Sequence, residues 1–129
     1  RGLSIRLNVA DPFPEVYGNP DRTEQVLIIL LDNAIKHGSA DEPLALGAEI
    51  SGDKVLVHVS NAGTIAEEDI AHLFERFYKA DRSHSGEGTG LGLSIAQEIM
   101  SLLDEKIWAQ NRNGRVEFTF TLSLNAEKV

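Results

Sequence analysis

The sequence predicts an α/β two-layer sandwich, in which one mixed sheet of about five strands is covered on one face by three helices. Two observations predict this fold class. Several short segments alternate apolar and polar residues with the period of two that is typical of half-buried strands. Between them lie longer segments with the start and stop signals of helices. The length of 129 residues suits one compact domain spanning residues 1–129.

The first strand and the first helix are predicted near the N-terminus. Residues 3 to 9 alternate as a half-buried strand does. Asn19 and Pro20 form a helix start, because asparagine caps free amides and proline suits the first helical position. Gly38 supplies a left-handed stop, so the helix should end at the preceding residue. Its middle, residues 26–31, is apolar on every side, and we therefore expect this helix to pack against the sheet.

Two β-hairpins are predicted from alternating segments that turn residues interrupt. Residues 44–50 and 55–59 alternate on either side of a Gly-Asp turn. Residues 107–110 and 115–124 read as strands joined through an Asn-Gly dipeptide, which is a strong hairpin signal. Together with the N-terminal strand, these segments supply the five strands of the predicted sheet.

Two further helices are predicted between the hairpins. The acidic residues at 67–69 favour a helix start, because negative side chains interact favourably with the positive N-terminal end of the helix dipole. Apolar residues at helical spacing extend this helix to Tyr78. Residues 79–88 are polar and rich in turn formers, so we expect them to be mobile. A third helix should run from about residue 90 to residue 103.

Composition and charge exclude several classes of protein. Cysteine is absent, which excludes disulfide frameworks, thiolate metal sites and cysteine nucleophiles. The four histidines, at positions 37, 58, 72 and 84, lack the short spacing of a zinc motif. A net charge of −8 argues against binding to nucleic acid or direct contact with an anionic membrane. Because a strand pattern starts at once after Arg1, we expect the chain to be a piece of a longer protein.

The densest chemical signal is a run of glycines at alternate positions that opens the third helix: Gly86, Gly88, Gly90 and Gly92. Glycines let the main chain approach a ligand closely, and the free amides of a helix start attract phosphate. A P-loop is excluded because no lysine follows the glycines, and a dinucleotide fold because no strand directly precedes them. The lysine strand and His-Arg-Asp loop of protein kinases are also missing. A flexible loop before an ordinary helix is the less favoured alternative.

Two weaker signals lie on the first helix and at the end of a strand. Asn33, Lys36 and His37 share one helix face, where an asparagine oxygen could bind Mg²⁺ and a lysine could neutralise phosphate. Taken alone, this triplet is better explained as the solvated end of a helix. Asn61, followed by Gly63, could accept a hydrogen bond from an amino group of a ligand, and a plain Asx turn explains it equally well.

In this order, these segments closely resemble the catalytic ATP-binding domain of bacterial two-component sensor histidine kinases. That domain belongs to the GHKL superfamily, which shares its nucleotide-binding (Bergerat) fold with DNA gyrase, MutL and the large heat-shock chaperones. Residues 21–37 look like the N box of the family, and residues 61–65 like its first glycine box. Residues 74–79, Phe-Glu-Arg-Phe-Tyr-Lys, look like the F box, and residues 88–93 like the second glycine box.

The resemblance implies an ATP site with bound Mg²⁺. Its residues come from the four boxes: Asn33, Lys36, His37, Asn61, Gly63, Ile65, Tyr78, Lys79, Gly88, Thr89, Gly90, Leu91, Gly92 and Leu93. Asn33 would hold Mg²⁺, and Lys36 and Lys79 would contact the phosphates. The main chain of residues 88–92 would wrap the phosphate chain, and Asn61 would accept a hydrogen bond from the adenine amino group.

Three departures from the family pattern bear on affinity. Ile29 stands where the family usually has a second asparagine, and it cannot bind metal. Asn61 replaces an aspartate, so its hydrogen bond to adenine lacks the assistance of a charge. A glycine of the first glycine box is missing between Thr64 and Ile65. We expect adenine nucleotides to bind, weakened by about 1–2 kcal/mol.

By resemblance, the parent protein transfers the γ-phosphoryl group of ATP to a histidine on a separate, upstream helical domain, and from there to an aspartate of a response regulator. None of the four histidines of this chain is a good phosphoacceptor, so the fragment should bind ATP without phosphorylating itself. Residues 79–88 would form a lid that orders on nucleotide. We expect a monomeric fragment from the cytoplasmic part of a membrane-anchored sensor.

Two alternatives to a working histidine kinase stay open. The chain could be a degenerate GHKL nucleotide-binding or interaction module without kinase activity, with Ile29 and Asn61 marking lost catalysis. It could also be a serine-kinase anti-sigma factor, although the Phe-Glu-Arg-Phe-Tyr segment favours the sensor kinase.

Overall fold

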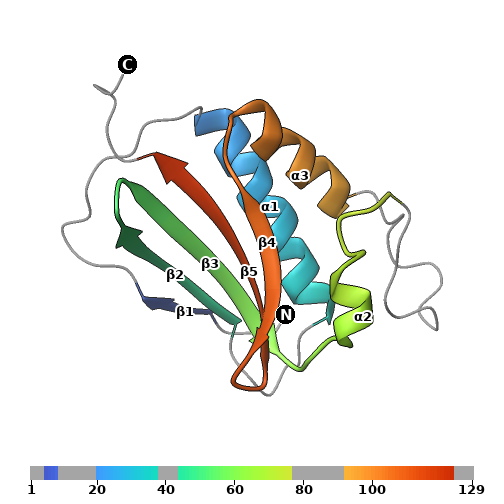
Figure 1. Ribbon diagram of the computed structural model, residues 1–129. Helices are drawn as coiled ribbons and strands as arrows, with labels where there is room; N and C mark the ends of the chain where they lie inside the picture. The colour runs from blue at the N-terminus through green and yellow to red at the C-terminus, as the bar shows by residue number, and fades with distance from the viewer. Residues whose placement is uncertain (1–4, 9–19, 38–43, 77–91, 124–129) are drawn as a thin grey trace.

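The computed structural model describes residues 5–8, 20–37, 44–76 and 92–123 and forms a two-layer α/β sandwich (Figure 1). The strands are β1 (Ile5–Asn8), β2 (Leu44–Ser51), β3 (Lys54–Ala62), β4 (Ile107–Arg112) and β5 (Arg115–Ser123). The helices are α1 (Pro20–His37), α2 (Glu67–Ile70) and α3 (Gly92–Leu102). The predicted fold class is confirmed, and each predicted strand is present.

The five strands form one sheet in the order β1-β2-β3-β5-β4. β1 and β2 are parallel and are connected through α1, whereas the other neighbours are antiparallel. The sheet is therefore mixed, as predicted. The β4–β5 hairpin turns at Asn113 and Gly114, whose φ angles are +54° and +77°. Two successive positive φ angles match the right-handed twist of the strands, which explains the strength of the Asn-Gly signal.

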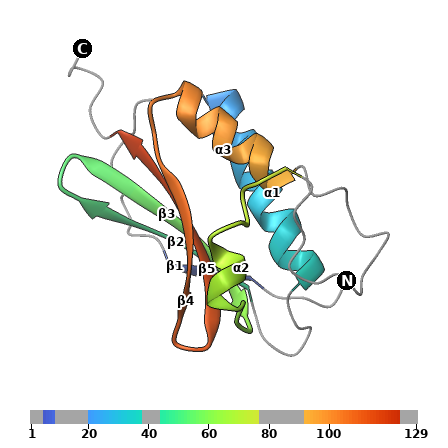
Figure 2. The ribbon, with the colours of Figure 1, turned by 45° about the vertical axis from the view of Figure 1, so that its right-hand side comes forward.

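The helices cover one face of the sheet, and α1 and α3 lie side by side on it (Figure 2). On β5, the side chains of Val116, Phe118 and Phe120 point toward the helices and are buried. The helices and the other strands complete the core with Val26, Leu30, Ala34, Leu44, Val55, Val59, Leu73, Ala96, Ile99, Met100 and Leu122. The apolar residues of the alternating segments face the helices, and on β5 Thr119 and Thr121 of the opposite face are buried as well.

The apolar middle of α1 is only partly enclosed. Val26 and Leu30 are fully buried against the sheet, as predicted, but Ile28 is 56% exposed. At 3.6 residues per turn, Ile28 lies on the opposite side of the helix from the sheet. Among the helices of the described segments, none is both long and apolar enough to span a bilayer.

The second helix is shorter than predicted. The sequence predicts it over residues 67–78, but α2 ends at Ile70, and residues 77 and 78 lie outside the described part. After Ile70, the chain continues in three-residue turns, in which the amides of His72 and Leu73 bond to carbonyls three positions back. This tighter winding buries Leu73 and places the ring of Phe74 edge-on against Phe118, with centroids 6.2 Å apart.

The third helix ends in a Schellman motif. The described part of α3 runs from Gly92 to Leu102, against a predicted range of about 90 to 103, and residues 90 and 91 lie outside the described part. At its C-terminal end, the amide of Glu105 bonds to the carbonyl of Met100 at 2.8 Å, and Asp104 has a φ of +62°. A left-handed residue at this position ends the helix and directs the chain into β4.

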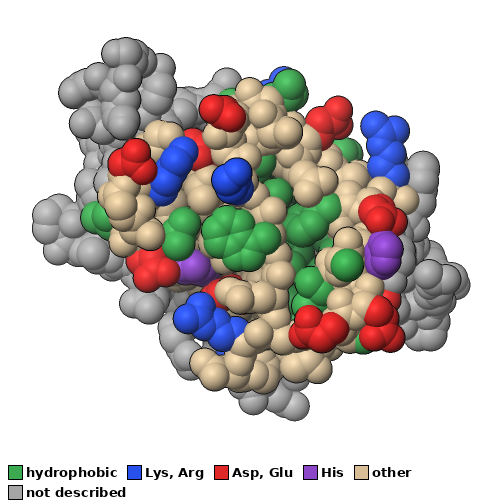
Figure 3. Space-filling view, in the orientation of Figure 1, with side chains coloured by type: hydrophobic (Ala, Val, Ile, Leu, Met, Phe, Trp, Pro, Cys, Tyr) green, Lys and Arg blue, Asp and Glu red, His purple; other side chains and the backbone are tan. Residues whose placement is uncertain are grey.

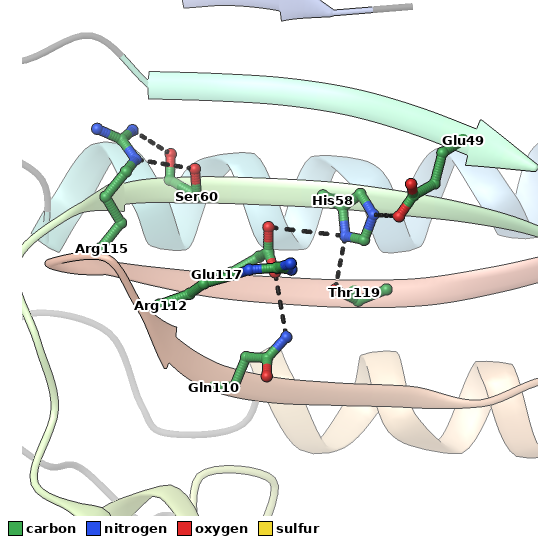
Figure 4. A network of polar contacts seen from close by, with 8 residues as sticks. All are labelled: Glu49, His58, Ser60, Gln110, Arg112, Arg115, Glu117 and Thr119. Carbon is green, nitrogen blue, oxygen red and sulfur yellow. Dashed lines mark hydrogen bonds and ion pairs between the residues drawn. The ribbon is translucent and has the colours of Figure 1, made fainter.

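The open face of the sheet, opposite the helices, carries a network of polar side chains (Figure 4). The Nε2 atom of His58 on β3 lies 2.9 Å from Oε2 of Glu49 on β2, and its Nδ1 lies 2.8 Å from Oγ1 of Thr119 on β5. Arg115 donates to the hydroxyl and the carbonyl oxygen of Ser60. Figure 3 shows acidic, basic and apolar side chains interspersed on the surface seen from the side of Figure 1.

A buried carboxylate ties the end of α3 to this open face. The side chain of Glu105 is 7% exposed. One of its oxygens accepts hydrogen bonds from Lys54 Nζ at 2.8 Å and from Thr121 Oγ1 at 2.6 Å. The other accepts from Ser123 Oγ at 2.9 Å. Glu105 thus joins the segment after α3 to β3 and β5.

Replacing Glu105 with alanine should lower the free energy of unfolding by about 2 kcal/mol, because three donors lose an acceptor that is itself nearly buried. Chemical denaturation followed by circular dichroism measures this change. Glu98→Ala, on the exposed side of α3, is the matched control and should change stability by less than about 0.5 kcal/mol. Equal stability of the two variants would contradict the role assigned to Glu105.

Candidate functional site

The C-terminal half of α1 carries the predicted metal and phosphate residues. Asn33 and Lys36 lie on α1 as predicted, one turn apart. Asn33 is half-buried and Lys36 is exposed, with its Nζ 3.2 Å from a carboxylate oxygen of Asp32. His37 is the last residue of α1, and its side chain lies outside the described part.

The start of α3 lies against α1 beside these residues. A Cβ atom built on Gly92 would lie 3.6 Å from Cγ2 of Ile29, which precedes Asn33 by one turn. Leu93, the next residue, is half-buried and packs on the core. The structure therefore brings the end of the glycine-rich segment next to the helix face that carries Asn33. These two signals are more than fifty residues apart in the sequence.

The third predicted element is the C-terminal end of β3. Asn61 is 4% exposed and pairs with Val116 on the face that the helices cover. Its Nδ2 donates to the carbonyl oxygen of Ala62 at 3.0 Å. The other amide atom of Asn61, Oδ1, is the one predicted to accept a hydrogen bond from the amino group of a ligand, and this role stays a prediction.

The segment after β3 is tied to the β4–β5 hairpin. Gly63 has a φ of +116°, and its amide donates to the carbonyl oxygen of Gly114 at 3.0 Å. The main chain of Ile65 bonds to the side-chain amide of Asn111. Sequence reasoning missed Asn111. The signal that could have revealed it is an asparagine at a strand position that faces the core.

The predicted site residues on the F box and on the first part of the second glycine box lie outside the described part of the chain. They are Tyr78, Lys79, Gly88, Thr89, Gly90 and Leu91, and the predicted lid at residues 79–88 falls in the same range. Figures 1 and 2 show that the C-terminal end of α1, the end of β3 and α2 gather at one end of the sandwich. Over the described ranges, no group of three or more His, Asp and Glu side chains could hold a metal ion.

A comparison with protein families agrees with this geometry. Residues 18–126 match the model of the family described as histidine kinase-, DNA gyrase B-, and HSP90-like ATPase. The chain belongs to this ATPase family. Membership implies the use of ATP, and it confirms the family predicted from the four boxes.

Within the ATPase family, the similar proteins are histidine kinases. The adaptive-response sensory kinase SasA of Nostoc sp. is 34% identical over 125 residues, which cover 95% of this chain and 31% of SasA. The catalytic domain of histidine kinase ThkA superposes with a TM-score of 0.84 at 32% identity, covering 99% of this chain and 83% of that one. A structure of ThkA in complex with the response regulator protein TrrA matches with a TM-score of 0.80 at 29% identity, covering 98% of this chain and 36% of that one.

These similarities confirm that this member of the ATPase family is the ATP-binding catalytic domain of a histidine kinase. The chain spans less than a third of the length of SasA. The complete architecture of a kinase of this type therefore extends well beyond the part that this chain matches.

Proposed function

We propose that the chain binds Mg-ATP between the C-terminal half of α1, the start of α3 and the end of β3. From there it presents the γ-phosphoryl group to a histidine on a separate, upstream helical domain of the same protein. The observation that carries this proposal is the packing of Gly92 against Ile29, one turn from Asn33. It joins the proposed phosphate-binding segment to the proposed metal ligand.

In this proposal, the predicted residues contact either the base or the phosphates. Asn61 Oδ1 accepts from the adenine amino group, next to Gly63 and Ile65. Lys36 and Lys79 neutralise phosphate charge, and the main-chain amides near the start of α3 bind phosphate oxygens. The nucleotide is surrounded by the predicted set: Asn33, Lys36, His37, Asn61, Gly63, Ile65, Tyr78, Lys79, Gly88, Thr89, Gly90, Leu91, Gly92 and Leu93.

The side chain of Asn33 fits a magnesium ion bound mainly by phosphate and water. Mg²⁺ prefers hard oxygen ligands, retains several waters and needs few protein ligands. The half-buried amide of Asn33 supplies such an oxygen without a carboxylate cluster. Bound Mg²⁺ would neutralise charge on the phosphates. Ile29, where the family usually has a second asparagine, supplies an apolar contact to the start of α3 instead.

The histidines of the described part are poorly placed to accept the phosphoryl group. His58 lies on the open face of the sheet, between Glu49 and Thr119, on the side away from α1 and α3 (Figure 4). His72 lies in the turn after α2, where its Nδ1 is 2.7 Å from Oε2 of Glu75. This supports transfer to a histidine outside this chain, and we expect the isolated chain not to phosphorylate itself. Catalysis would come from positioning and from neutralisation of charge.

The proposal extends to the partners and location of the parent protein. Passage of the phosphoryl group to a response regulator is supported by the structure of ThkA with TrrA. We propose a monomeric domain, comprising residues 1–129, in the cytoplasmic part of a membrane-anchored sensor. Neither nucleic acid nor direct membrane contact is part of the proposed function.

Isothermal titration of the chain with ATP and Mg²⁺ tests the proposal. A dissociation constant between micromolar and sub-millimolar is expected. The lack of binding heat at millimolar nucleotide would favour the second candidate, a degenerate module that only docks partners. The apolar packing of Ile29 at a position that usually carries an asparagine is the observation that favours this candidate. A longer chain with the upstream helical domain, given labelled ATP, tests the transfer itself.

Replacing Asn61 with leucine should remove the preference for adenine while preserving the fold, because leucine has a similar size and the site is buried. The wild type should bind ATP about five- to tenfold more tightly than inosine triphosphate, which lacks the amino group. The variant should bind both equally. Calorimetric titration of the two nucleotides gives this ratio, and a ratio that the substitution leaves unchanged would show that the base is recognised elsewhere.

A further inference from the structure

The side chain of Asn111 holds both main-chain polar groups of Ile65. Its Oδ1 accepts from the amide of Ile65 at 2.9 Å, and its Nδ2 donates to the carbonyl oxygen of Ile65 at 2.7 Å. Nδ2 also lies 3.2 Å from a carboxylate oxygen of Glu67. Asn111 belongs to β4, an edge strand of the sheet. The side-chain amide of Asn111 therefore bonds to the main-chain N–H and C=O of Ile65, as the main chain of a neighbouring strand would.

Asn111 and Asn61 lie on the same rung of the sheet. Val116 of β5 is the register partner of Asn61 on β3 and of Asn111 on β4. Directly opposed residues project from the same face, so both asparagines face the helices together with Val116. Asn61, which is proposed to contact adenine, and Asn111, which holds Ile65, thus lie on either side of the core residue Val116.

The segment after Asn61 is fixed at two points. The first is the bond from the Gly63 amide to the carbonyl of Gly114, and the second is the pair of bonds between Ile65 and Asn111. Thr64, between the two points, is exposed. The first bond involves main-chain groups of a hairpin turn and does not depend on side-chain identity. The second depends on a side chain that carries both a donor group and an acceptor group.

We propose that Asn111 is a positioning residue of the nucleotide site, an inference that rests on the proposed function. Asn111 does not touch the nucleotide. It holds Ile65, and thereby the turn that follows Asn61, in the position that receives the base. Other inward positions of β4 carry apolar residues, such as Ile107 and Ala109, so the amide at this position serves the contact with Ile65 rather than the core.

Titration of the chain with Mg-ATP and with magnesium and inorganic triphosphate tests this inference. For Asn111→Ala, the dissociation constant of ATP should rise about five- to tenfold, whereas that of inorganic triphosphate should stay unchanged. If Asn111 only stabilised the fold, its loss would lower the affinity for ATP and for inorganic triphosphate together. Gln110→Ala is the matched control: Gln110 is the neighbouring amide on β4, and it donates to Glu117 on the open face at 3.2 Å. This control should change neither constant.

A second variant covers the case in which Asn111→Ala unfolds. Asn111→Thr keeps a residue suited to a strand, and its single hydroxyl can pair one of the two groups of Ile65, so the affinity for ATP should be intermediate. If ATP affinity in the folded variants equals that of the wild type, or falls in step with that of triphosphate, the positioning role is wrong and the proposed function still holds. If the wild type binds no ATP, both are wrong.

Discussion

Asn33→Ala is expected to remove most of the contribution of Mg²⁺ to ATP binding. In the proposed site, the Asn33 amide is the protein ligand of the metal, and Ile29, one turn earlier, cannot replace it. Loss of one bond to a charged group costs about 1.5–3 kcal/mol, which corresponds to about a tenfold to hundredfold weaker affinity. The fold should be preserved, because Asn33 is half-buried on a helix and alanine is the better helix former.

Calorimetric titration of ATP with Mg²⁺ and with a chelator measures this effect. The wild type should bind much more tightly with Mg²⁺, and Asn33→Ala should bind about equally under both conditions. Gln97→Ala, which removes an exposed amide from α3, should behave as the wild type. If Asn33→Ala retained the full magnesium dependence, the metal ligand would have to be sought elsewhere in the chain.

Gly92→Ala is expected to weaken ATP binding by about tenfold or more without destabilising the fold. In the structure, a Cβ at this position would lie 3.6 Å from Ile29 Cγ2, which is an ordinary van der Waals contact. The fold itself therefore has room for alanine. The proposed site does not, because the phosphates must approach the main chain closely at this helix start. Each lost bond from an amide to a phosphate oxygen costs about 1.5–3 kcal/mol.

Thermal unfolding and nucleotide titration of the same sample separate the two effects. The melting temperature of Gly92→Ala should equal or exceed that of the wild type, while its affinity for ATP falls. Ser101→Ala, at the exposed C-terminal end of α3, should leave both unchanged. Unaltered ATP affinity in Gly92→Ala would mean that the phosphates lie away from the start of α3.

The fold was largely predictable because its determinants are local. The alternation in β2, β3 and β5 places apolar side chains on the face that the helices cover, and the Asn-Gly turn fixes one hairpin by its φ angles. The length of the second helix was wrong because spacing does not distinguish α-helical winding from successive three-residue turns. Leu73 and Phe74 reach the core in either conformation.

The site residues were selected from the order of the four boxes rather than from any one segment, because the segments of Asn33 and Asn61 each have a plain structural explanation of their own. The roles of these two residues stay predictions. The contact of Asn111 with Ile65 joins residues 46 positions apart, and an asparagine at a core-facing strand position indicates a polar contact without indicating its partner. The apolar packing of Ile29 beside Gly92 likewise follows from how α3 lies on α1. Such contacts depend on the packing of the whole domain.

A crystal structure of the chain with Mg²⁺ and a non-hydrolysable ATP analogue would show whether the nucleotide lies in the proposed site. We expect the adenine amino group within hydrogen-bond distance of Asn61 Oδ1, the phosphates against the main chain at the start of α3, and the metal on the Asn33 amide oxygen. Nucleotide bound at another face, or no nucleotide bound at saturating concentration, would contradict the proposed site.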